Sequence, residues 1–364
     1  MKKVISIVGA RPNFMKIAPI HKAFQQYSEK VQHLICHTGQ HFDEKMSEVF
    51  FTQLELPKPH FFLGIGGGSH AEQTAKIMME FEKIAITEKP DLVIVVGDVN
   101  STMACTLVTS KLGIKTAHVE AGLRSFDRQM PEEINRLVTD VLADYLFTTE
   151  AKAHNNLLRE GVSEDKIFFC GNVMIDSLVQ FLPKIEQSAI KTQLGIEAGK
   201  FILCTFHRPS NVDTQESLTN LVDLLNTLGK ERKVVFPIHP RTSNNLKKFG
   251  LDTNLSPNLI LTDPIGYIDF LNLTKNAELI VTDSGGVQEE STWLGVQCIT
   301  VRDNTERPIT VDVGTNQLIG TDLSKVKVAA LEVLNGFKKQ GGIPELWDGK
   351  AASRITEIIV NQIL

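Results

Sequence analysis

Several features that would mark particular protein classes are absent from this 364-residue sequence. The net charge is −5 and the pI is about 6.1, so the chain lacks the excess of Lys and Arg that nucleic-acid-binding domains carry. Its apolar runs are all shorter than the roughly 18 residues that a membrane helix needs. With 42% hydrophobic and 22% charged residues, the composition is typical of a globular protein. We therefore expect neither a nucleic acid nor a membrane as a partner.

The sequence also lacks the cysteine and histidine spacings that commonly bind metals. The five cysteines each lie in or beside an apolar run and form no C-x-x-C pair, which favours reduced core thiols in a cytoplasmic protein. The sequence contains no H-E-x-x-H motif. We therefore predict no metal site.

The common nucleotide-binding signatures are missing too. The first glycine loop, "GARPNF", is not G-x-G-x-x-G, and no Walker A sequence occurs. A bound NAD or a P-loop NTPase is therefore disfavoured, and no cofactor is predicted.

What the sequence does contain is a regular alternation of short β-branched runs with helical patterns. A segment such as "STMACTLVTSKLG" has apolar residues at helical spacing and a Gly at its end. Strands alternating with helices predict an α/β fold with doubly wound parallel sheets. The predicted strands span residues 4–8, 33–37, 92–96, 115–119, 145–148, 167–170, 201–206, 233–237, 259–261, 279–282 and 297–301.

The alternation breaks once, around residues 172–199, where the pattern reads as a helix, Pro183, a charged helix and a turn with Gly. We interpret this segment as a linker between two similar Rossmann-like domains. The last segment, "ASRITEIIVNQIL", has isoleucines on one side of an amphipathic helix. The predicted organisation is an N-terminal domain at 1–172, a second domain at 173–350 and a C-terminal helix at 351–364.

Reactive and anion-binding residue types follow the predicted strands. In an open parallel sheet, ligands bind beyond the carboxyl ends of the strands, so two such domains facing each other would enclose a cleft. In the first half, the segments after the strands begin at Gly9-Ala10-Arg11, Gly97-Asp98 and Glu120. In the second half they begin at His207-Arg208, His239-Pro240-Arg241 and Ser284-Gly285-Gly286, the last of which opens a helix whose N–H groups could bind a phosphate.

The acids around residue 120 allow two interpretations. Glu120 and Arg124, like Glu132 and Arg136, are four residues apart and could form ordinary surface ion pairs. Alternatively, Glu120 and Glu132 are paired carboxylates that transfer protons. The spacing alone favours the surface pair for Glu132.

An ordered series of motifs along nearly the whole chain resembles the non-hydrolysing UDP-N-acetylglucosamine 2-epimerases. The series comprises "GARPNFMK", "TGQHFD", "GDVNST", "HVEAGLRS", "PEEINR", "HRPSN", "TDSGGVQEE" and "TERP". The resemblance implies two Rossmann-like domains facing a cleft, which is the glycosyltransferase-B architecture. It also implies a homodimer and a C-terminal helix that crosses back to the N-terminal domain.

The resemblance further implies roles at matching positions of this sequence. The catalytic positions are the carboxylates Asp98, Glu120 and Glu132 and the histidine His207. The UDP-sugar positions are Arg11, Lys16, Arg208, His239, Phe270, Ser284, Gly285, Gly286, Glu290 and Arg307. The activator-binding region matches at Gln40 and His41.

The implied activity is reversible epimerisation at C2 of UDP-GlcNAc to UDP-ManNAc, for surface polysaccharide precursors. The implied mechanism is anti elimination of UDP to 2-acetamidoglucal followed by re-addition, and it requires no nicotinamide. Carboxylates suit both the proton transfers and the oxocarbenium-like centre at C1.

Two departures from the family pattern keep other activities open. "HRPSN" stands where "HRREN" is common, and "GIGGGSHAEQT" lacks an arginine expected near the activator site. Both suit a branch that acts on a modified UDP-sugar such as a diacetamido-uronate. A UDP-sugar glycosyltransferase, a hydrolysing epimerase and a non-catalytic UDP-sugar sensor are further alternatives.

Overall fold

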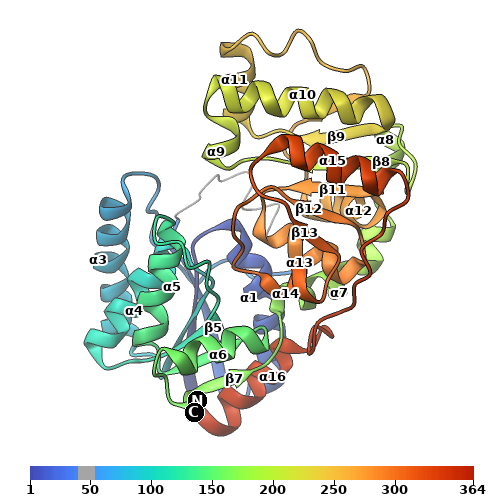
Figure 1. The fold of residues 1–364 in the computed structure, drawn as a ribbon. Coiled ribbons are helices and arrows are strands. Elements are labelled where there is room, and N and C mark those ends of the chain that lie inside the picture. The colour runs from blue at the N-terminus through green and yellow to red at the C-terminus, as the bar shows by residue number, and fades with distance from the viewer. Residues whose placement is uncertain (40–53) are drawn as a thin grey trace. The chain divides into compact units, whose positions relative to one another are not determined.

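A computed structural model describes residues 1–39 and 54–364 of the protein. The chain divides into two compact units: unit 1 comprises Met1–Val179 and Glu345–Leu364, and unit 2 comprises Gln180–Pro344. The division falls inside helix α7 (Val173–Glu186), within the segment predicted as a linker. Figure 1 shows the C-terminal end of the chain, in red, beside elements of unit 1.

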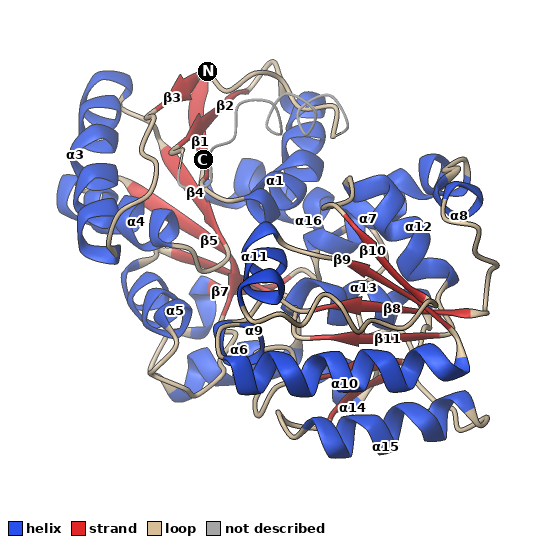
Figure 2. Cartoon of the chain, turned by 90° about the horizontal axis from the view of Figure 1, so that it is seen from above, coloured by secondary structure: helices blue, strands red, loops and turns tan. Residues whose placement is uncertain are grey.

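Unit 1 is built on a seven-stranded parallel sheet with the spatial order β3-β2-β1-β4-β5-β6-β7. Helices α3, α4 and α5 cover one face, and α1 and α16 lie on the other (Figures 1 and 2). Its strands are β1 (Lys2–Val8), β2 (Val31–His37), β3 (Phe61–Phe62), β4 (Leu92–Val96), β5 (Lys115–Ala121), β6 (Tyr145–Thr148) and β7 (Ile167–Phe169). Its helices are α1 (Arg11–Phe24), α3 (His70–Glu88), α4 (Asn100–Leu112), α5 (Pro131–Leu142), α6 (Ala151–Arg159), the first half of α7, and α16 (Ala351–Ile358), with 3₁₀ turns at Gln25–Tyr27 and Glu164–Lys166 and a π-helical turn at Ile359–Ile363.

Unit 2 has a six-stranded parallel sheet with the spatial order β10-β9-β8-β11-β12-β13. Helices α10 and α15 lie side by side on one face of it in both views. Its strands are β8 (Phe201–Thr205), β9 (Lys233–Pro237), β10 (Leu259–Thr262), β11 (Leu279–Thr282), β12 (Cys298–Thr300) and β13 (Asn316–Leu318). Its helices are α8 (Ile190–Gln193), α9 (Pro209–Val212), α10 (Gln215–Glu231), α11 (Pro240–Lys248), α12 (Tyr267–Asn276), α13 (Gly285–Leu294), α14 (Pro308–Asp312) and α15 (Leu323–Leu334).

The predicted strands are confirmed, with ends that shift by a few residues, as is the α/β class. Central strands such as β4, with the sequence LVIVV, are buried along their whole length, as parallel strands covered on both faces must be. The two strands that the sequence did not reveal, β3 and β13, are edge strands of two and three residues. Such short segments show no periodicity.

Pro183 does not separate two helices, as the sequence suggested, because α7 continues through it. A proline inside a helix removes one hydrogen bond, here the bond to the carbonyl of Val179 four residues earlier. Val179 is also the residue at which unit 1 ends. The helix therefore tolerates the proline near its end and lacks one bond at the boundary between the units.

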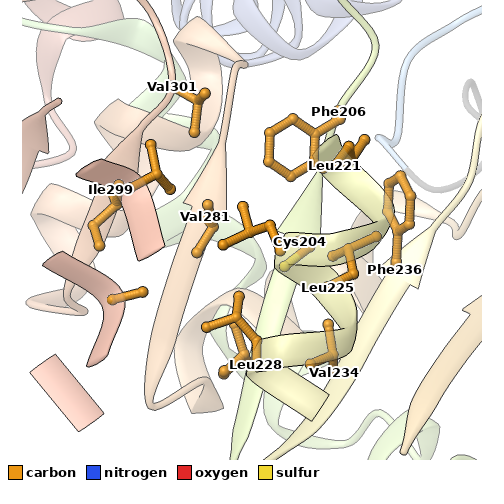
Figure 3. Close-up of a cluster of buried hydrophobic side chains, with 14 of the residues drawn as sticks. Cys204, Phe206, Leu221, Leu225, Leu228, Val234, Phe236, Val281, Ile299 and Val301 are labelled. Atoms are coloured by element: carbon orange, nitrogen blue, oxygen red, sulfur yellow. The ribbon is translucent and has the colours of Figure 1, made fainter. Parts of the chain in front are cut away.

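Apolar side chains fill the space between each sheet and its helices. In unit 2, Leu221, Leu225 and Leu228 of α10 pack on Cys204 and Phe236 of the sheet (Figure 3). A matching cluster in unit 1 lies between the sheet and helices α3 and α4. All five cysteines are free and buried, which confirms the prediction of core thiols.

The C-terminal segment is fastened to unit 1 by polar bonds as well as by packing. Helix α16 packs against α1. Asp176 accepts hydrogen bonds from the N–H groups of Ala351 (3.1 Å) and Ala352 (2.7 Å), the first two residues of α16. Trp347 is buried and donates its Nε1–H to the carbonyl of Thr149 at 3.0 Å. Unit 1 is thus completed by residues from the far end of the chain.

Candidate functional site

In each unit the chain first adds strands toward one edge of the sheet and then, from a switch point, adds the remaining strands toward the other edge. In unit 1 the switch point lies between β1 and β4, and in unit 2 between β8 and β11. Loops on either side of such a switch point diverge, and the crevice that they leave is where open α/β sheets bind ligands. The loops concerned are those that the sequence marked: after Val8 and Val96 in unit 1, and after Thr205 and Thr282 in unit 2.

An ion pair lies at the switch point of unit 1. Lys16 of α1 donates from Nζ to Glu120 Oε2 at 2.5 Å, and both side chains are buried, with 8% and 1% exposure. The position of a Cβ on Gly97 would lie 3.2 Å from Lys16 Nζ and 3.7 Å from Glu120 Oε2, so the loop before Asp98 passes directly over the pair. The structure therefore brings Lys16, Glu120 and the Asp98 loop together.

Asp98 is bound by helix α5. Its carboxylate forms an ion pair with Arg136, and its carbonyl accepts a hydrogen bond from Asn135 Nδ2 at 2.8 Å. Arg136 is buried and is also bound by Glu133 Oε2 at 2.7 Å. The side chain of Asp98 keeps 27% of its surface exposed, so it can reach a ligand while it is oriented by α5.

The surface-pair interpretation of these acids is wrong. Arg124 and Arg136 are buried, and their partners are Asp140 and Glu160 for Arg124, and Asp98 and Glu133 for Arg136. The four-residue spacing was misleading because the fold brings Asp140 and Glu160 to Arg124 and Asp98 to Arg136, while the local partner of Arg136 is Glu133, three residues before it.

The adjacent carboxylates Glu132 and Glu133 have different surroundings. Both lie in the first turn of α5, which begins at Pro131, but Glu132 is exposed and Glu133 is buried. Glu133 accepts hydrogen bonds from the N–H groups of Ser125 and Phe126, both at 3.0 Å. These donors and Arg136 hold the pKa of Glu133 below its ordinary value, although burial, the strongest influence, raises it.

The remaining unit 1 candidates are placed only in part. Arg11 is the first residue of α1. Gln40 and His41, the candidate activator residues, lie outside the described residues.

In unit 2, a buried aspartate that the sequence analysis did not name organises the His207–Arg208 loop. Asp283 follows β11 and accepts hydrogen bonds from the N–H of His207 (3.0 Å), the N–H of Arg208 (2.9 Å) and Asn211 Nδ2 (3.0 Å). The ring of His207 lies 2.7 Å from Asp283 Oδ1 and keeps 55% of its side chain exposed. Asp283 therefore orients a solvent-facing histidine.

The pKa of Asp283 lies below its ordinary value although the side chain is buried. Burial is the strongest influence and raises the pKa, but the bonds from His207, Arg208 and Asn211 together outweigh it. The group is thus a carboxylate held by donors. Its signal in the sequence was its place directly after a predicted strand, in "TDSGG".

The turn Ser284-Gly285-Gly286 opens α13, as predicted. The first turn of α13 carries no acidic side chain of its own, which leaves its N–H groups and the positive end of the helix dipole suited to an anion. A Cβ on Gly286 would meet no atom within 4 Å, so the backbone is open to an approaching anion, whereas a Cβ on Gly285 would lie 2.6 Å from Glu306 Oε1.

The other unit 2 candidates are spread over several elements around this turn. Glu290 is buried on α13, and Arg307 is buried with its Nε 3.0 Å from Glu289 Oε1. Phe270 is half-buried on α12, which packs against α13. His239 is exposed and caps α11, where its Nδ1 accepts from the N–H of Arg241.

Residues 1–39 and 54–364 contain neither a cluster of metal ligands nor a membrane-spanning helix. No group of three or more His, Cys, Asp and Glu side chains there could hold a metal ion. None of the helices there is long and apolar enough to cross a membrane.

Two doubly wound parallel-sheet domains, each with a switch point in its strand order, define a protein of the glycosyltransferase-B architecture. The family model described as UDP-N-acetylglucosamine 2-epimerase matches residues 22–360. The chain belongs to this family and is therefore an isomerase.

The relatives agree with this assignment. The chain is 46% identical to the UDP-N-acetylglucosamine 2-epimerase of Methanocaldococcus jannaschii, with 98% of each chain covered. It is 40% identical to the UDP-2,3-diacetamido-2,3-dideoxy-D-glucuronate 2-epimerase of Pseudomonas aeruginosa, over 98% of this chain and 99% of that one. The crystal structure of the M. jannaschii enzyme in complex with UDP-GlcNAc and UDP superposes with a TM-score of 0.90 at 45% identity, covering 99% of both chains.

Proposed function

We propose that this protein interconverts UDP-GlcNAc and UDP-ManNAc by inverting the configuration at C2 of the sugar. The observation that supports the proposal best is the buried Lys16–Glu120 pair beside the Asp98 loop at the switch point of unit 1. Glu120 and Asp98 are the carboxylates available there for proton transfer. A relative that is 46% identical to this chain is named for the same reaction.

The chemistry explains why two carboxylates are needed. The C2 proton of an N-acetylhexosamine is not adjacent to a carbonyl, so it is not acidic by itself. When the bond from C1 to the diphosphate oxygen breaks, its electron pair leaves with UDP and positive charge develops at C1. A carboxylate then takes the C2 proton, and 2-acetamidoglucal is formed. Re-addition of UDP, with a proton delivered to the opposite face of C2, gives the epimer.

We assign the proton transfers to unit 1 and the diphosphate to unit 2. Asp98 and Glu120 act near C2, and Glu132 assists the return of the proton. His207 completes the catalytic set. The open N-terminus of α13 at Ser284–Gly286 would stabilise the departing diphosphate, because the N–H groups and the helix dipole favour an anion there.

The remaining assignments follow the family. Nucleotide and phosphate recognition falls to Arg11, Lys16, Arg208, His239, Phe270, Glu290 and Arg307. The reaction is redox-neutral overall and uses no nicotinamide. We further propose a cytoplasmic homodimer that supplies surface polysaccharide precursors, and the five free, buried cysteines are compatible with a reducing compartment.

A UDP-diacetamido-glucuronate is a second candidate substrate. The P. aeruginosa relative, named for a diacetamido-glucuronate, is 40% identical to this chain. Such a sugar differs at C3 and C6 but would undergo the same elimination at C1 and C2. Pro209 and Ser210, in place of the common "RE" of "HRREN", are where the two substrates could be distinguished.

Proton NMR with each UDP-sugar and without any acceptor tests these proposals. New anomeric signals of UDP-ManNAc, with deuterium incorporated at C2 in heavy water, are expected from UDP-GlcNAc. Turnover of the UDP-diacetamido-uronate alone would assign the modified sugar instead. Release of free ManNAc would indicate a hydrolysing epimerase, and consumption of UDP-GlcNAc only after an acceptor is added would indicate a glycosyltransferase.

A further inference from the structure

Glu120 has an unusual backbone conformation. Its φ is +71°, in the left-handed region that a residue with a side chain rarely occupies, and the register of β5 with β6 shifts between Val119 and Ala121. Residues strained in this way persist only where their surroundings hold them, and such residues cluster at functional sites. The surroundings of Glu120 therefore have to supply that restraint.

One carboxylate bonds the chain on both sides of Glu120. Asp140 of α5 accepts from His118 Nδ1 at 2.6 Å through Oδ1, and from the N–H of Gly122 at 3.0 Å through Oδ2. His118 precedes Glu120 by two residues and Gly122 follows it by two. Gly122 itself has a φ of +78°, and a Cβ there would lie 2.3 Å from the carbonyl oxygen of Ala153. Asp140 thus bridges the bulge that presents Glu120.

The same network reaches the loop of the second carboxylate. His118 Nε2 donates to the carbonyl of Gly97 at 2.8 Å, and the N–H of Gly97 donates to the carbonyl of Val119 at 3.1 Å. Gly97 directly precedes Asp98. A shift of the His118 ring would therefore move both carboxylates that the proposed reaction uses.

The hydrogen-bond partners fix the orientation of the His118 ring. Nε2 faces a carbonyl oxygen, which can only accept, and Nδ1 faces the carboxylate of Asp140. The pKa of Asp140 lies below its ordinary value, since His118 and Arg124 outweigh the burial that most strongly raises it. Both ring nitrogens of His118 therefore face oxygen atoms, so the ring is held from both sides.

Arg124 connects Asp140 to a second carboxylate. Arg124 binds Asp140 Oδ2 at 2.7 Å and Glu160 through Nε (2.8 Å) and a terminal nitrogen (2.6 Å). Arg124 thus bridges two carboxylates, Asp140 and Glu160. A buried ion pair is costly when one partner is removed, which makes the geometry resistant to displacement.

We infer that His118 and Asp140 are positioning residues that hold Glu120 and the Asp98 loop in the geometry for proton transfer at C2. The inference rests on the proposed epimerase function. Neither side chain needs to touch the substrate, because Asp140 acts through the backbone of the bulge and His118 through the carbonyl of Gly97.

The decisive variant is Asp140→Asn. Three N–H groups converge on Asp140, so an amide would place a donor against donors and remove the charge that His118 faces. We expect kcat to fall about a hundredfold with KM changed less than about threefold, because small displacements of catalytic groups cost rate rather than binding. Asp140→Glu, which keeps the carboxylate, should recover part of the rate.

Glu160→Gln is the matched control. It removes a carboxylate from the same network, on the far side of Arg124, where the Glu160 side chain is 31% exposed. We expect a lower melting temperature with kcat within about twofold of wild type. If Glu160→Gln and Asp140→Asn lower kcat in proportion to their losses of stability, the positioning role is refuted.

Two variants of His118 separate its two bonds. The amide of His118→Asn can reach Asp140 in place of Nδ1, and that of His118→Gln can reach Gly97 in place of Nε2. Each should lower kcat less than Asp140→Asn, and they remain informative if Asp140→Asn does not fold. Wild-type kcat in both would overturn the inference.

A crystal structure of Asp140→Asn, or of His118→Asn if it alone is soluble, separates this inference from the proposed function. We expect Glu120 to leave the left-handed region in the variant. If wild type turns over neither UDP-sugar, the proposed function fails, but the structure still decides the positioning role. An unchanged bulge in the variant would overturn it.

Discussion

The two units share one strand order but differ in what they place at the switch point. Unit 1 has buried ion pairs there, with the Glu120 side chain 1% exposed and the Lys16 side chain 8% exposed. Unit 2 has a histidine with a 55% exposed side chain and the open N-terminus of α13. The same strand order thus positions acid–base groups in unit 1 and hydrogen-bond donors for an anion in unit 2.

The comparison teaches that charge and burial, not topology, distinguish the two sites. In unit 1 the carboxylates are locked by cations, so substitutions should affect the chemical step. In unit 2 a single buried carboxylate, Asp283, orders a loop of donors, so substitutions should affect binding of the nucleotide. The following predictions test that division, in order of their effect on turnover.

The largest effect is expected from Glu120→Gln. The variant removes a proton acceptor and leaves Lys16 buried without its carboxylate partner, so turnover should fall about a thousandfold. UDP affinity should change less than about threefold, which calorimetry with UDP would measure. Glu197→Gln, at a 72% exposed surface pair, is the control and should behave as wild type. Retained C2 exchange in Glu120→Gln would show that Glu120 is not required.

Asp98→Asn and Glu132→Gln should differ, although both positions match catalytic acids of the family. Asp98 is oriented by Arg136, whereas Glu132 is exposed. We expect a loss of about a hundredfold or more for Asp98→Asn and of about tenfold at most for Glu132→Gln. Initial rates from proton NMR would measure both. A larger loss for Glu132→Gln would show that α5 moves this side chain inward when substrate binds.

Asp283→Asn should weaken nucleotide binding. The asparagine cannot accept from His207, Arg208 and Asn211 together, so the loop loses its order. We expect UDP affinity to fall about tenfold and stability to fall by about 2 kcal/mol, since buried donors lose their charged acceptor. Calorimetry and denaturant unfolding measure the two effects. Asp223→Asn, on an exposed position of α10, is the control.

The smallest effect on turnover, none at all, is expected from Asp176→Asn, which tests the attachment of α16 to unit 1. Burial above all, with Asp348 adding to it, raises the pKa of Asp176 to about 6, against the bonds from Ala352 and Ala351. Because the folded pKa exceeds the unfolded one, Asp176 adds stability below about pH 4, and this is lost as pH rises through about 6.

The stability of wild type relative to Asp176→Asn should therefore fall by about 2 kcal/mol between pH 4 and pH 6.5. Urea unfolding of both proteins across this range measures the difference. Parallel pH profiles for the two proteins would show that Asp176 does not titrate with the fold.

Much of the fold was readable because the signals are local. A β-branched run such as β4 encodes a buried parallel strand, and Gly113 ends α4 in the left-handed conformation, as its sequence position indicated. The loops after the strands were also readable, since a parallel sheet brings all carboxyl ends to one edge. The two shortest strands, β3 and β13, were not, because two or three residues show no period.

The pairing of charges could not be read in this way. Lys16 and Glu120 are 104 positions apart and meet because β1, β4 and β5 are neighbours in the sheet. Glu132 and Glu133 are adjacent, and only the rotation of α5 decides which is buried.

By itself, the sequence determined the alternation of strands and helices, the loops that carry reactive residues, and the family. The tertiary structure alone decided the partners of each charge, the left-handed bulge at Glu120 and the role of Asp283. The physical reason is that secondary structure follows from patterns within a few residues, whereas an ion pair depends on the strand order that brings distant segments together.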